Sequence, residues 1–466
     1  MNNNSSNKIR LAVLMLFIAM FARTDFLQSK TLFTLAPKTL SDTIPDIKVK
    51  IFPHSTGFIP HREDTVKSRL KITSKTPFMV YELDSFKESQ EAILAKTNSI
   101  KLNAYKLKTP VILKGTSPLT IHRSGELTSY SYNGQIIVYP IKVNSLKKYL
   151  LVVNKINIEE YLKGVIPSEI IPTWDKEALK TQTVAARTYA MFHMLYARKF
   201  SKNKYFDVDD SITYQVYTGI SNEHTNTNQA IEETRGEILT FDNKVIQAYY
   251  HADAGGSTDS AIDVWHKSIP YCLSKKEPFK SSYKWEKVLT AWELTQKLQD
   301  SSILSSNEKV KNIVISTKTK TGRVLGVKII TSSNQTIKIG VGALKKAVSL
   351  DSSMFKILKQ GKYPKYSSLK FKFSGSGFGH GIGMSQMGAQ KLSSHLKWNY
   401  KKILHHYYTN INICSLYQKD NINKCHINDI SDFNDVDIDF SSSKKAPLEA
   451  SINTKTNTKR GSSSQF

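Results

Sequence analysis

A single carboxylate stands in an almost wholly apolar stretch of the chain. In the sequence VIPSEIIP, residues 165–172, Glu169 is flanked by aliphatic residues and two prolines. A poorly hydrated carboxyl group has a raised pKa, which brings it into the range where it donates a proton near neutral pH. Glu169 is therefore the candidate general acid. The structural alternative is that its carboxylate caps a backbone amide.

The elements that must position this carboxylate are a strand before it and a helix after it. Proline is disfavoured inside a helix and pushes the preceding residue toward an extended conformation, so the prolines predict a stiff connector over 165–172. Thr173 or Asp175 can cap the following helix, which is predicted to run to about Arg198. Apolar residues recur on one face of it at spacings of three and four. Gln182 interrupts that face, and its amide needs a partner, either in the core or on a substrate hydroxyl.

Two glycine-rich segments supply further candidates for substrate contact. In QAYYHADAGGSTD, residues 247–259, the pattern predicts a strand that delivers Tyr250 and His251 toward Gly255 and Gly256. Because glycine has no side chain, the backbone here can approach a ligand closely. The structural alternative is an ordinary glycine-rich turn with the tyrosine in the core.

The second glycine-rich segment is GSGFGHGIGMSQMGAQ, residues 375–390, where every second residue from 375 to 383 is glycine. This spacing predicts a tight loop that leads into a helix from Met384, an arrangement that presents backbone N–H groups to a ligand. His380 is expected to be the exposed titratable side chain of this loop. The segment lacks the phosphate-loop signature, so nucleotide binding is disfavoured. The residues of this segment predicted to cap the helix or contact substrate are Gly379, His380, Gly381, Ser385 and Gln386.

Composition and charge restrict the partners. The chain has 466 residues, which is more than one ordinary core accommodates and predicts two structural units plus tails. Lysine and arginine number 66 against 39 aspartates and glutamates, and the net charge of +27 favours a polyanionic partner. Zinc-finger spacing, RNP-like motifs and a compact basic helix are missing from the sequence, so nucleic acid is not expected. Cell-wall polymers and anionic lipid headgroups fit the charge equally well, and a lysine-rich solvated surface is the simpler interpretation.

The two ends of the chain differ from its middle. Lys8 and Arg10 precede an apolar run, residues 11–22, which has the length of a signal peptide and is shorter than a membrane-spanning helix. Residues 1–30 are therefore predicted to be a signal peptide or a short membrane anchor. The protein is expected to be exported and to lie in a periplasmic, extracytoplasmic or cell-wall location. Residues 427–466 are rich in Ser, Asp, Asn and Lys and are expected to form a disordered tail.

The middle of the chain predicts an α+β fold. Short runs rich in β-branched and aromatic residues indicate a mainly antiparallel β region over 48–160, and a helix-containing catalytic core follows over 161–413. In an oxidising compartment Cys414 can pair with Cys425, which leaves Cys272 free and buried.

Four ordered motifs resemble one protein family. They are EYLKGVIPSE, EALKTQTVAARTYA, QAYYHADAGGSTDSAIDVW, and GSGFGHGIGMSQMGAQ followed by YKKILHHYY. Together they are similar to the stage II sporulation protein D / LytB family of peptidoglycan-acting proteins, over about residues 48–413. The resemblance implies a lytic transglycosylase that cuts glycan strands from which amidases have removed the stem peptides. Some members of the family are instead described as enhancers of an amidase.

The resemblance also assigns residues. Lys180 and Arg187 match family positions and are candidates for binding the glycan or its lactyl carboxylate. In some relatives, cysteines and a histidine bind zinc in the stretch that corresponds to residues 205–219. At the corresponding positions this chain carries Asp209, Thr213 and Tyr214. Threonine and tyrosine are poor zinc ligands, so neither a metal nor another cofactor is expected.

The implied reaction needs one strong acid. Neutral Glu169 would donate a proton to the glycosidic oxygen between MurNAc and GlcNAc and then, as a carboxylate, take the proton of the muramic acid 6-hydroxyl. That hydroxyl attacks within its own sugar, so proximity replaces the second carboxylate of a conventional glycosidase and leaves a 1,6-anhydroMurNAc end. Peptidoglycan glycan strands are the expected substrate and a cell-wall amidase the expected partner. Two other interpretations stay open: a non-catalytic enhancer of an N-acetylmuramoyl-L-alanine amidase, and an adhesion or secretion scaffold.

Overall fold

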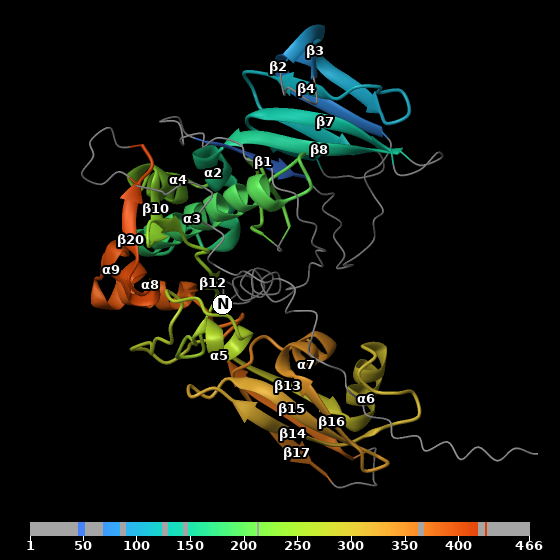
Figure 1. Ribbon diagram of the computed structural model, residues 1–466, viewed down its shortest axis with the longest axis vertical. Helices are drawn as coiled ribbons and strands as arrows, with labels where there is room; N and C mark the ends of the chain where they lie inside the picture. Colours follow the sequence, from blue (N-terminus) through green and yellow to red (C-terminus); the bar gives the residue numbers. More distant parts are fainter. Residues whose placement is uncertain are drawn as a thin grey trace, which may run out of the picture.

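The computed structural model of the chain describes most residues between 45 and 417. The described ranges are 45–51, 69–83, 90–123, 129–142, 148–211, 214–361, 368–417 and residue 425. The predicted leader, residues 1–30, and the predicted tail, residues 427–466, lie outside them. Figure 1 shows a large sheet, a central group of helices and a second group of strands and helices that follow one another along the long axis of the molecule.

An antiparallel sheet occupies the N-terminal part. Its strand order is β6-β5-β2-β4-β7-β8-β1-β9, with β3 beside β2, and of its pairs only β1 and β9 run parallel. Strand β8 is buried on both faces, because Leu150 and Val152 face the helices while Leu151 and Val153 face a smaller cluster on the other side. The sheet confirms the mainly antiparallel β region and, with the helices that follow, the α+β fold. Its strands are β1 (Asp46–Lys50), β2 (Arg69–Leu83), β3 (Gln90–Asn103), β4 (Val111–Lys114), β5 (Leu119–Arg123), β6 (Ser129–Tyr132), β7 (Gln135–Lys142), β8 (Lys148–Asn157) and β9 (Val208–Asp209).

Two helices, α2 (Ile158–Glu169) and α3 (Lys176–Phe200), lie below this sheet in Figure 1. Of the two predicted caps, Asp175 and not Thr173 begins α3, since its carboxylate accepts a hydrogen bond from the Glu177 N–H at 3.0 Å. Helix α3 is buried on two sides: Ala186 packs in the cluster beneath the large sheet, and Ala185 packs in a cluster formed with the C-terminal elements. This helix is the central support of the fold.

The predicted connector over 165–172 is wrong, because α2 continues through Pro167 and ends only at Glu169. A proline removes one N–H from the helix, and near the end of a helix that loss affects only the final turn. There the Ser168 hydroxyl donates to the Gly164 carbonyl at 3.2 Å, and the Ile170 N–H bonds the Ile166 carbonyl at 3.0 Å. The general-acid candidate therefore sits on the last residue of a helix.

The segments after α3 bring distant parts of the chain together. Strand β10 pairs with both β11 and the C-terminal β20, and β12 pairs in parallel with β19. The latter pairing sets the two glycine-rich segments side by side. The elements concerned are α4 (Thr225–Glu233), β10 (Glu237–Phe241), β11 (Lys244–Val245), β12 (Tyr250–His251), α5 (Ala261–Trp265), β19 (Met384–Ser385), α8 (Gln386–Leu396), α9 (Tyr400–Tyr407) and β20 (Asn412–Ser415).

Residues between β13 and β18 have a hydrophobic cluster of their own. Two three-stranded sheets, β13-β18-β17 and β14-β15-β16, share it with two helices. A hairpin turn at 321–322 joins β14 to β15. The elements are β13 (Lys284–Thr290), α6 (Ala291–Asp300), β14 (Val310–Lys318), β15 (Val324–Thr331), β16 (Thr336–Gly340), α7 (Val341–Val348), β17 (Phe355–Gln360) and β18 (Lys370–Ser376).

The cysteine prediction is confirmed: Cys414 and Cys425 form a disulfide, and Cys272 is free and buried. No helix within the described ranges has the length and hydropathy needed to cross a membrane.

Candidate active site

Glu169 lies at the C-terminal end of α2 with only 7% of its surface exposed. One carboxylate oxygen, Oε1, accepts a hydrogen bond from the Val216 N–H at 2.9 Å. Burial raises the pKa of this carboxyl from the ordinary 4.5 to about 7, and the Val216 bond opposes the rise only in part. Near neutral pH the group is thus able to give and to take a proton.

Two buried amides lie next to Glu169. The Gln386 side chain donates from Nε2 to the Glu169 carbonyl at 3.1 Å and to Oε1 of Gln182 at 3.3 Å. Gln182 is completely buried, and within the described part of the chain its Nε2 has no hydrogen-bond partner. A buried amide donor without a partner requires an explanation, and a substrate oxygen is one. The end of α2, helix α3 and the start of α8 are thus joined through Glu169, Gln182 and Gln386.

Tyrosines surround the carboxylate. Burial raises the pKa of Tyr250, and the charge of Glu169 raises it further. The same two causes act on Tyr161, which donates from its hydroxyl to Gln215 Oε1 at 3.3 Å. Gln215 Nε2 in turn donates to the Tyr250 hydroxyl at 3.1 Å. The neighbours of Glu169 are therefore mostly neutral polar and aromatic groups.

Gln215 and Val216 were not predicted as site residues. Residues 205–219 were considered only as the stretch that holds zinc ligands in some relatives, whereas the structure brings the second half of this stretch against Glu169. The available signal was the family resemblance, since the zinc ligands of some relatives lie in the same stretch.

His380 is not the exposed side chain that the glycine spacing predicted. Its Nε2 donates to the Tyr250 carbonyl at 3.0 Å, and its Nδ1 accepts from the Ile382 N–H at 3.1 Å. Burial lowers the pKa of His380 to about 3, so the ring is neutral at physiological pH. The neighbouring His251 is fully buried, with Nδ1 bonded to the Ile382 carbonyl at 3.1 Å. Both histidines hold the β12–β19 junction together.

The glycines of the second segment permit close packing rather than ligand access. Gly379 has φ +111°, and a Cβ there would lie 2.8 Å from the His251 Cβ. Gly381 has φ +81°, and a Cβ there would lie 2.2 Å from the Arg323 Cζ. The Gly379 N–H is already bonded to the Asp351 carbonyl at 3.0 Å. The predicted presentation of this backbone amide to a ligand is therefore wrong, because the protein itself occupies it.

Gly255 and Gly256, the glycines of the first segment, differ in how closely other atoms pack around them. The Gly255 N–H donates to Asp253 Oδ1 at 2.7 Å, and a Cβ at Gly255 would lie 3.0 Å from the Ser376 carbonyl oxygen. A Cβ at Gly256 would have no atom within 4 Å. The backbone is thus closely packed on its Cβ side at Gly255 and open on that side at Gly256.

Comparisons with known proteins agree with this geometry. The family described as Stage II sporulation protein matches residues 147–241, which include α2 and α3 with Glu169 and Gln182. The stage II sporulation protein D of Bacillus subtilis is 31% identical to the chain over 251 residues, which cover 51% of this chain and 68% of that protein. The chain belongs to the stage II sporulation protein D / LytB family. The resemblance inferred from the four motifs is thereby confirmed.

Two other relatives differ in how much of their own length this chain matches. The Amidase enhancer of Bacillus subtilis is 31% identical over 304 residues, which are 54% of this chain but only 40% of that relative. An uncharacterized protein of Brachyspira hyodysenteriae is 32% identical over 370 residues, 75% of this chain and 90% of the relative. A second family, described as Domain of unknown function (DUF8618), matches residues 266–383, which contain β13 to β18.

The two cations that match positions of the stage II sporulation protein D family lie in different surroundings. Arg187 is fully buried and forms a two-pronged ion pair with Glu159, with Nη2 to Oε2 at 2.7 Å and Nε to Oε1 at 2.9 Å. Its burial argues against the predicted glycan contact. Lys180 has 15% of its side chain exposed and pairs with Glu233 at 2.7 Å and Glu177 at 3.1 Å. A substrate carboxylate at Lys180 would have to compete with both.

The remaining predicted residue, Ser385, begins α8. Its hydroxyl accepts from the Gly388 N–H at 3.1 Å and from the Ala254 N–H at 3.3 Å. Ser385 is fully buried and caps the helix, whereas the Gln386 side chain reaches the backbone carbonyl of Glu169.

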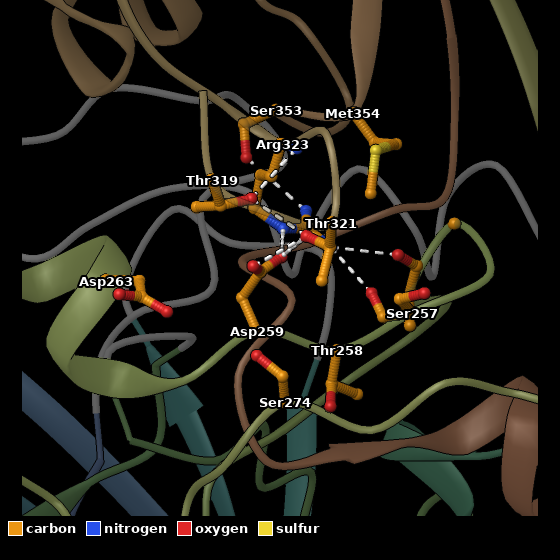
Figure 2. A network of polar contacts seen from close by, with 12 residues as sticks. Ser257, Thr258, Asp259, Asp263, Ser274, Thr319, Thr321, Arg323, Ser353 and Met354 are labelled. Carbon is orange, nitrogen blue, oxygen red and sulfur yellow. Dashed lines mark hydrogen bonds and ion pairs between the residues drawn. The ribbon is translucent and has the colours of Figure 1, made fainter. Parts of the chain in front are cut away.

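A buried ion pair joins the part of the chain between β13 and β18 to the glycine-rich segments (Figure 2). Arg323, from the β14–β15 turn, donates from Nε to Asp259 Oδ2 at 2.8 Å and from Nη2 to the Ala254 carbonyl at 2.9 Å. Figure 2 also shows Thr321 directed at the same carboxylate, which it meets at 2.6 and 2.7 Å. Both charged side chains are 1% exposed. Sequence spacing gave no signal for this pair.

Within the residues that the structure describes, no group of three or more His, Cys, Asp or Glu is placed to hold a metal ion. Asp207 is paired with Arg198 at 2.8 Å, and Asp209 accepts from the Ser211 N–H at 3.0 Å. Thr213 lies outside the described ranges.

Proposed function

We propose that the protein is a peptidoglycan lytic transglycosylase with Glu169 as its general acid and base. The observation that carries the proposal is the buried position of this carboxyl, which raises its pKa to about 7. A general acid–base group works best when its pKa lies near the operating pH, because both protonation states are then populated.

The reaction follows from one proton-shuttling group. Neutral Glu169 donates its proton to the glycosidic oxygen between MurNAc and GlcNAc as that bond breaks. The resulting carboxylate takes the proton of the MurNAc 6-hydroxyl, whose oxygen attacks C1 of the same sugar. The product is a 1,6-anhydroMurNAc end, and Glu169 is neutral again. Because the attack is intramolecular, a second carboxylate to activate water is not needed.

The neighbouring polar groups orient the glycan in this proposal. The unpartnered Gln182 Nε2 donates to a sugar oxygen such as the carbonyl of an N-acetyl group. Gln386 fixes the Gln182 amide by donating to its Oε1. Further sugar contacts are proposed at the open side of Gly256 and at the Tyr250 hydroxyl, which accepts from Gln215 Nε2 and can still donate.

The setting of the enzyme is part of the same proposal. Residues 1–30 export or anchor the chain, residues 48–160 and 161–413 act as one unit on the glycan, and an amidase removes stem peptides before cleavage. The protein therefore works in the periplasmic, extracytoplasmic or cell-wall space.

Glu169→Gln is the test. The full chain is incubated with peptide-free glycan strands and the ends are identified by mass spectrometry. Wild type is expected to produce 1,6-anhydroMurNAc ends and Glu169→Gln none, with unchanged strand binding in a pull-down. Glu232→Gln is the matched control, because Glu232 is an exposed carboxylate of α4, paired only with Arg235 in the described structure. Equal product from wild type and Glu169→Gln contradicts the proposal.

A second candidate function is stimulation of an N-acetylmuramoyl-L-alanine amidase. Two observations favour it: the similarity to a relative named Amidase enhancer, and the low exposure of Glu169, whose carboxylate caps the Val216 N–H. In that case wild type produces no anhydro ends, and wild type and Glu169→Gln accelerate peptide release by the amidase equally.

A further inference from the structure

Among the described residues, helices cover one side of the two three-stranded sheets formed by β13 to β18, and the other side carries exposed side chains. Helices α6 and α7 contact β13, β14, β15 and β16 and lie on one side of these strands in Figure 1. The residues that face the helices are buried apolar side chains of a single cluster. They include Trp285, Leu289, Ile313, Val327, Ile329, Phe355, Phe371 and Phe373. The residues that alternate with them point to the opposite side, since successive side chains of a strand face opposite ways.

Strand register arranges the outward residues of the first sheet in rows. Val288 on β13 lies opposite Lys372 on β18, and Lys372 lies opposite Leu358 on β17. Val288 is 51% exposed and Leu358 57% exposed, although both are aliphatic. The adjacent rows are Glu286–Ser374–Lys356 and Thr290–Lys370–Gln360, and Lys284 stands opposite Ser376 at the end.

The second sheet repeats the pattern. Val314 on β14 lies opposite Lys328 on β15, and Lys328 lies opposite Lys338 on β16. Val314 is 39% exposed, and both lysines are exposed. Strand β14 contacts β17, so the outward sides of the two sheets adjoin. We call this combined outward surface the lysine face.

The lysine face has a strong excess of positive charge. Its lysines are Lys284, Lys328, Lys338, Lys356, Lys370 and Lys372. Among the strand residues described here, Glu286 is the one carboxylate on this surface, and it pairs with Lys372 at 2.8 Å. For the other five lysines, no carboxylate of the described chain lies within ion-pair distance. We propose that the lysine face binds a linear phosphate-bearing polymer of the cell wall, independently of the glycan site at Glu169.

The spacing of the lysine face fits a polymer with regularly repeated phosphates. Lysine binds phosphate as a point charge, so each lysine can meet one phosphate without a fixed bidentate geometry. Alternate residues on one strand, such as Lys370 and Lys372, are about 6.6 Å apart along it. An extended polyol phosphate can meet them with successive phosphates, while Val288 and Leu358 contact its carbon backbone.

The test uses the full chain and poly(glycerol phosphate) as the probe, with binding measured by fluorescence anisotropy at several salt concentrations. Lys284→Gln/Lys356→Gln/Lys370→Gln is expected to bind at least tenfold more weakly at low salt, since each lysine near an anionic partner contributes roughly fivefold. The slope of log K against log salt should fall by about 0.7 for each lost contact. The matched control removes three exposed lysines from the large sheet and its connection: Lys71→Gln/Lys101→Gln/Lys108→Gln.

Each outcome decides the proposal. A loss confined to the lysine-face variant, with unchanged unfolding temperature and unchanged glycan binding, supports it. Equal losses of binding affinity in both triple variants overturn the proposal, because the effect would then come from the net charge of the protein. Tighter binding to phosphatidylglycerol vesicles or to a single-stranded polynucleotide than to poly(glycerol phosphate) also overturns it, because the partner would then be a membrane or a nucleic acid. Glycan cleavage is scored separately, so failure of either proposal leaves the other intact.

Discussion

Replacing Glu169 by glutamine should change how the stability of the protein depends on pH. Burial raises the folded-state pKa of Glu169 from 4.5 to about 7. A folded state with the higher pKa binds the proton more tightly than the unfolded chain does. The stabilisation from the protonated carboxyl is therefore complete below about pH 4.5 and is lost as the pH rises through about 7.

The magnitude follows from the shift. One pKa unit corresponds to about 1.4 kcal/mol, so the shift to about 7 corresponds to about 3 kcal/mol of lost stability in the wild type. Glutamine has a similar shape, accepts the Val216 bond and carries no charge. Glu169→Gln should match the wild type near about pH 4.5 and exceed it by about 3 kcal/mol near about pH 8.

Urea unfolding of the full chain, followed by circular dichroism at a series of pH values, measures this difference. Glu232→Gln is again the control, because it removes an exposed carboxylate of α4 by the same chemical change. A stability difference between wild type and Glu169→Gln that does not grow with pH would refute the reasoning, because the carboxyl would then not be desolvated.

Other predictions concern the contacts that hold the site. Arg323→Met should lower the free energy of unfolding by about 3–5 kcal/mol, because Asp259 stays buried without its cation. The double variant with Asp259→Asn should be less destabilised. Urea unfolding of both variants checks this, and an unchanged free energy of unfolding in Arg323→Met contradicts it. Gly381→Ala should destabilise the protein by about 1–3 kcal/mol in thermal unfolding, since φ is +81° and the new Cβ would meet Arg323. An unfolding temperature of Gly381→Ala equal to that of the wild type would contradict the packing role of this glycine. Cys414→Ser should destabilise by about 3 kcal/mol, because the link to Cys425 closes a loop with a sequence separation of 11; identical unfolding of wild type under reducing and oxidising conditions would contradict this.

Local patterns predicted the elements whose signals are local. Asp175, one of two candidate caps of α3, and the antiparallel region were both predicted, from capping residues and from short runs of β-branched residues. Pro167 was misinterpreted because its effect depends on position: in the final turn of α2 it removes a single bond, whereas in the middle it would break the helix.

The candidate site was predicted where burial is encoded by neighbours in sequence, and missed where it depends on distant partners. The aliphatic residues around Glu169 indicated desolvation correctly. His380 was expected to be exposed because glycines flank it, but those glycines let His251 and Arg323 pack against the loop. Arg187 matched a family position, yet its pairing with Glu159 depends on how α2 and α3 cross, which spacing does not reveal.

The most direct test of the central claim is the mass of the newly formed glycan ends in water enriched in oxygen-18. If Glu169 directs the 6-hydroxyl of MurNAc onto its own C1, wild-type ends are lighter than hydrolysed ends by one water and contain no heavy oxygen, and Glu169→Gln forms none. Ends that carry heavy oxygen, or anhydro ends that persist in Glu169→Gln, would contradict the account.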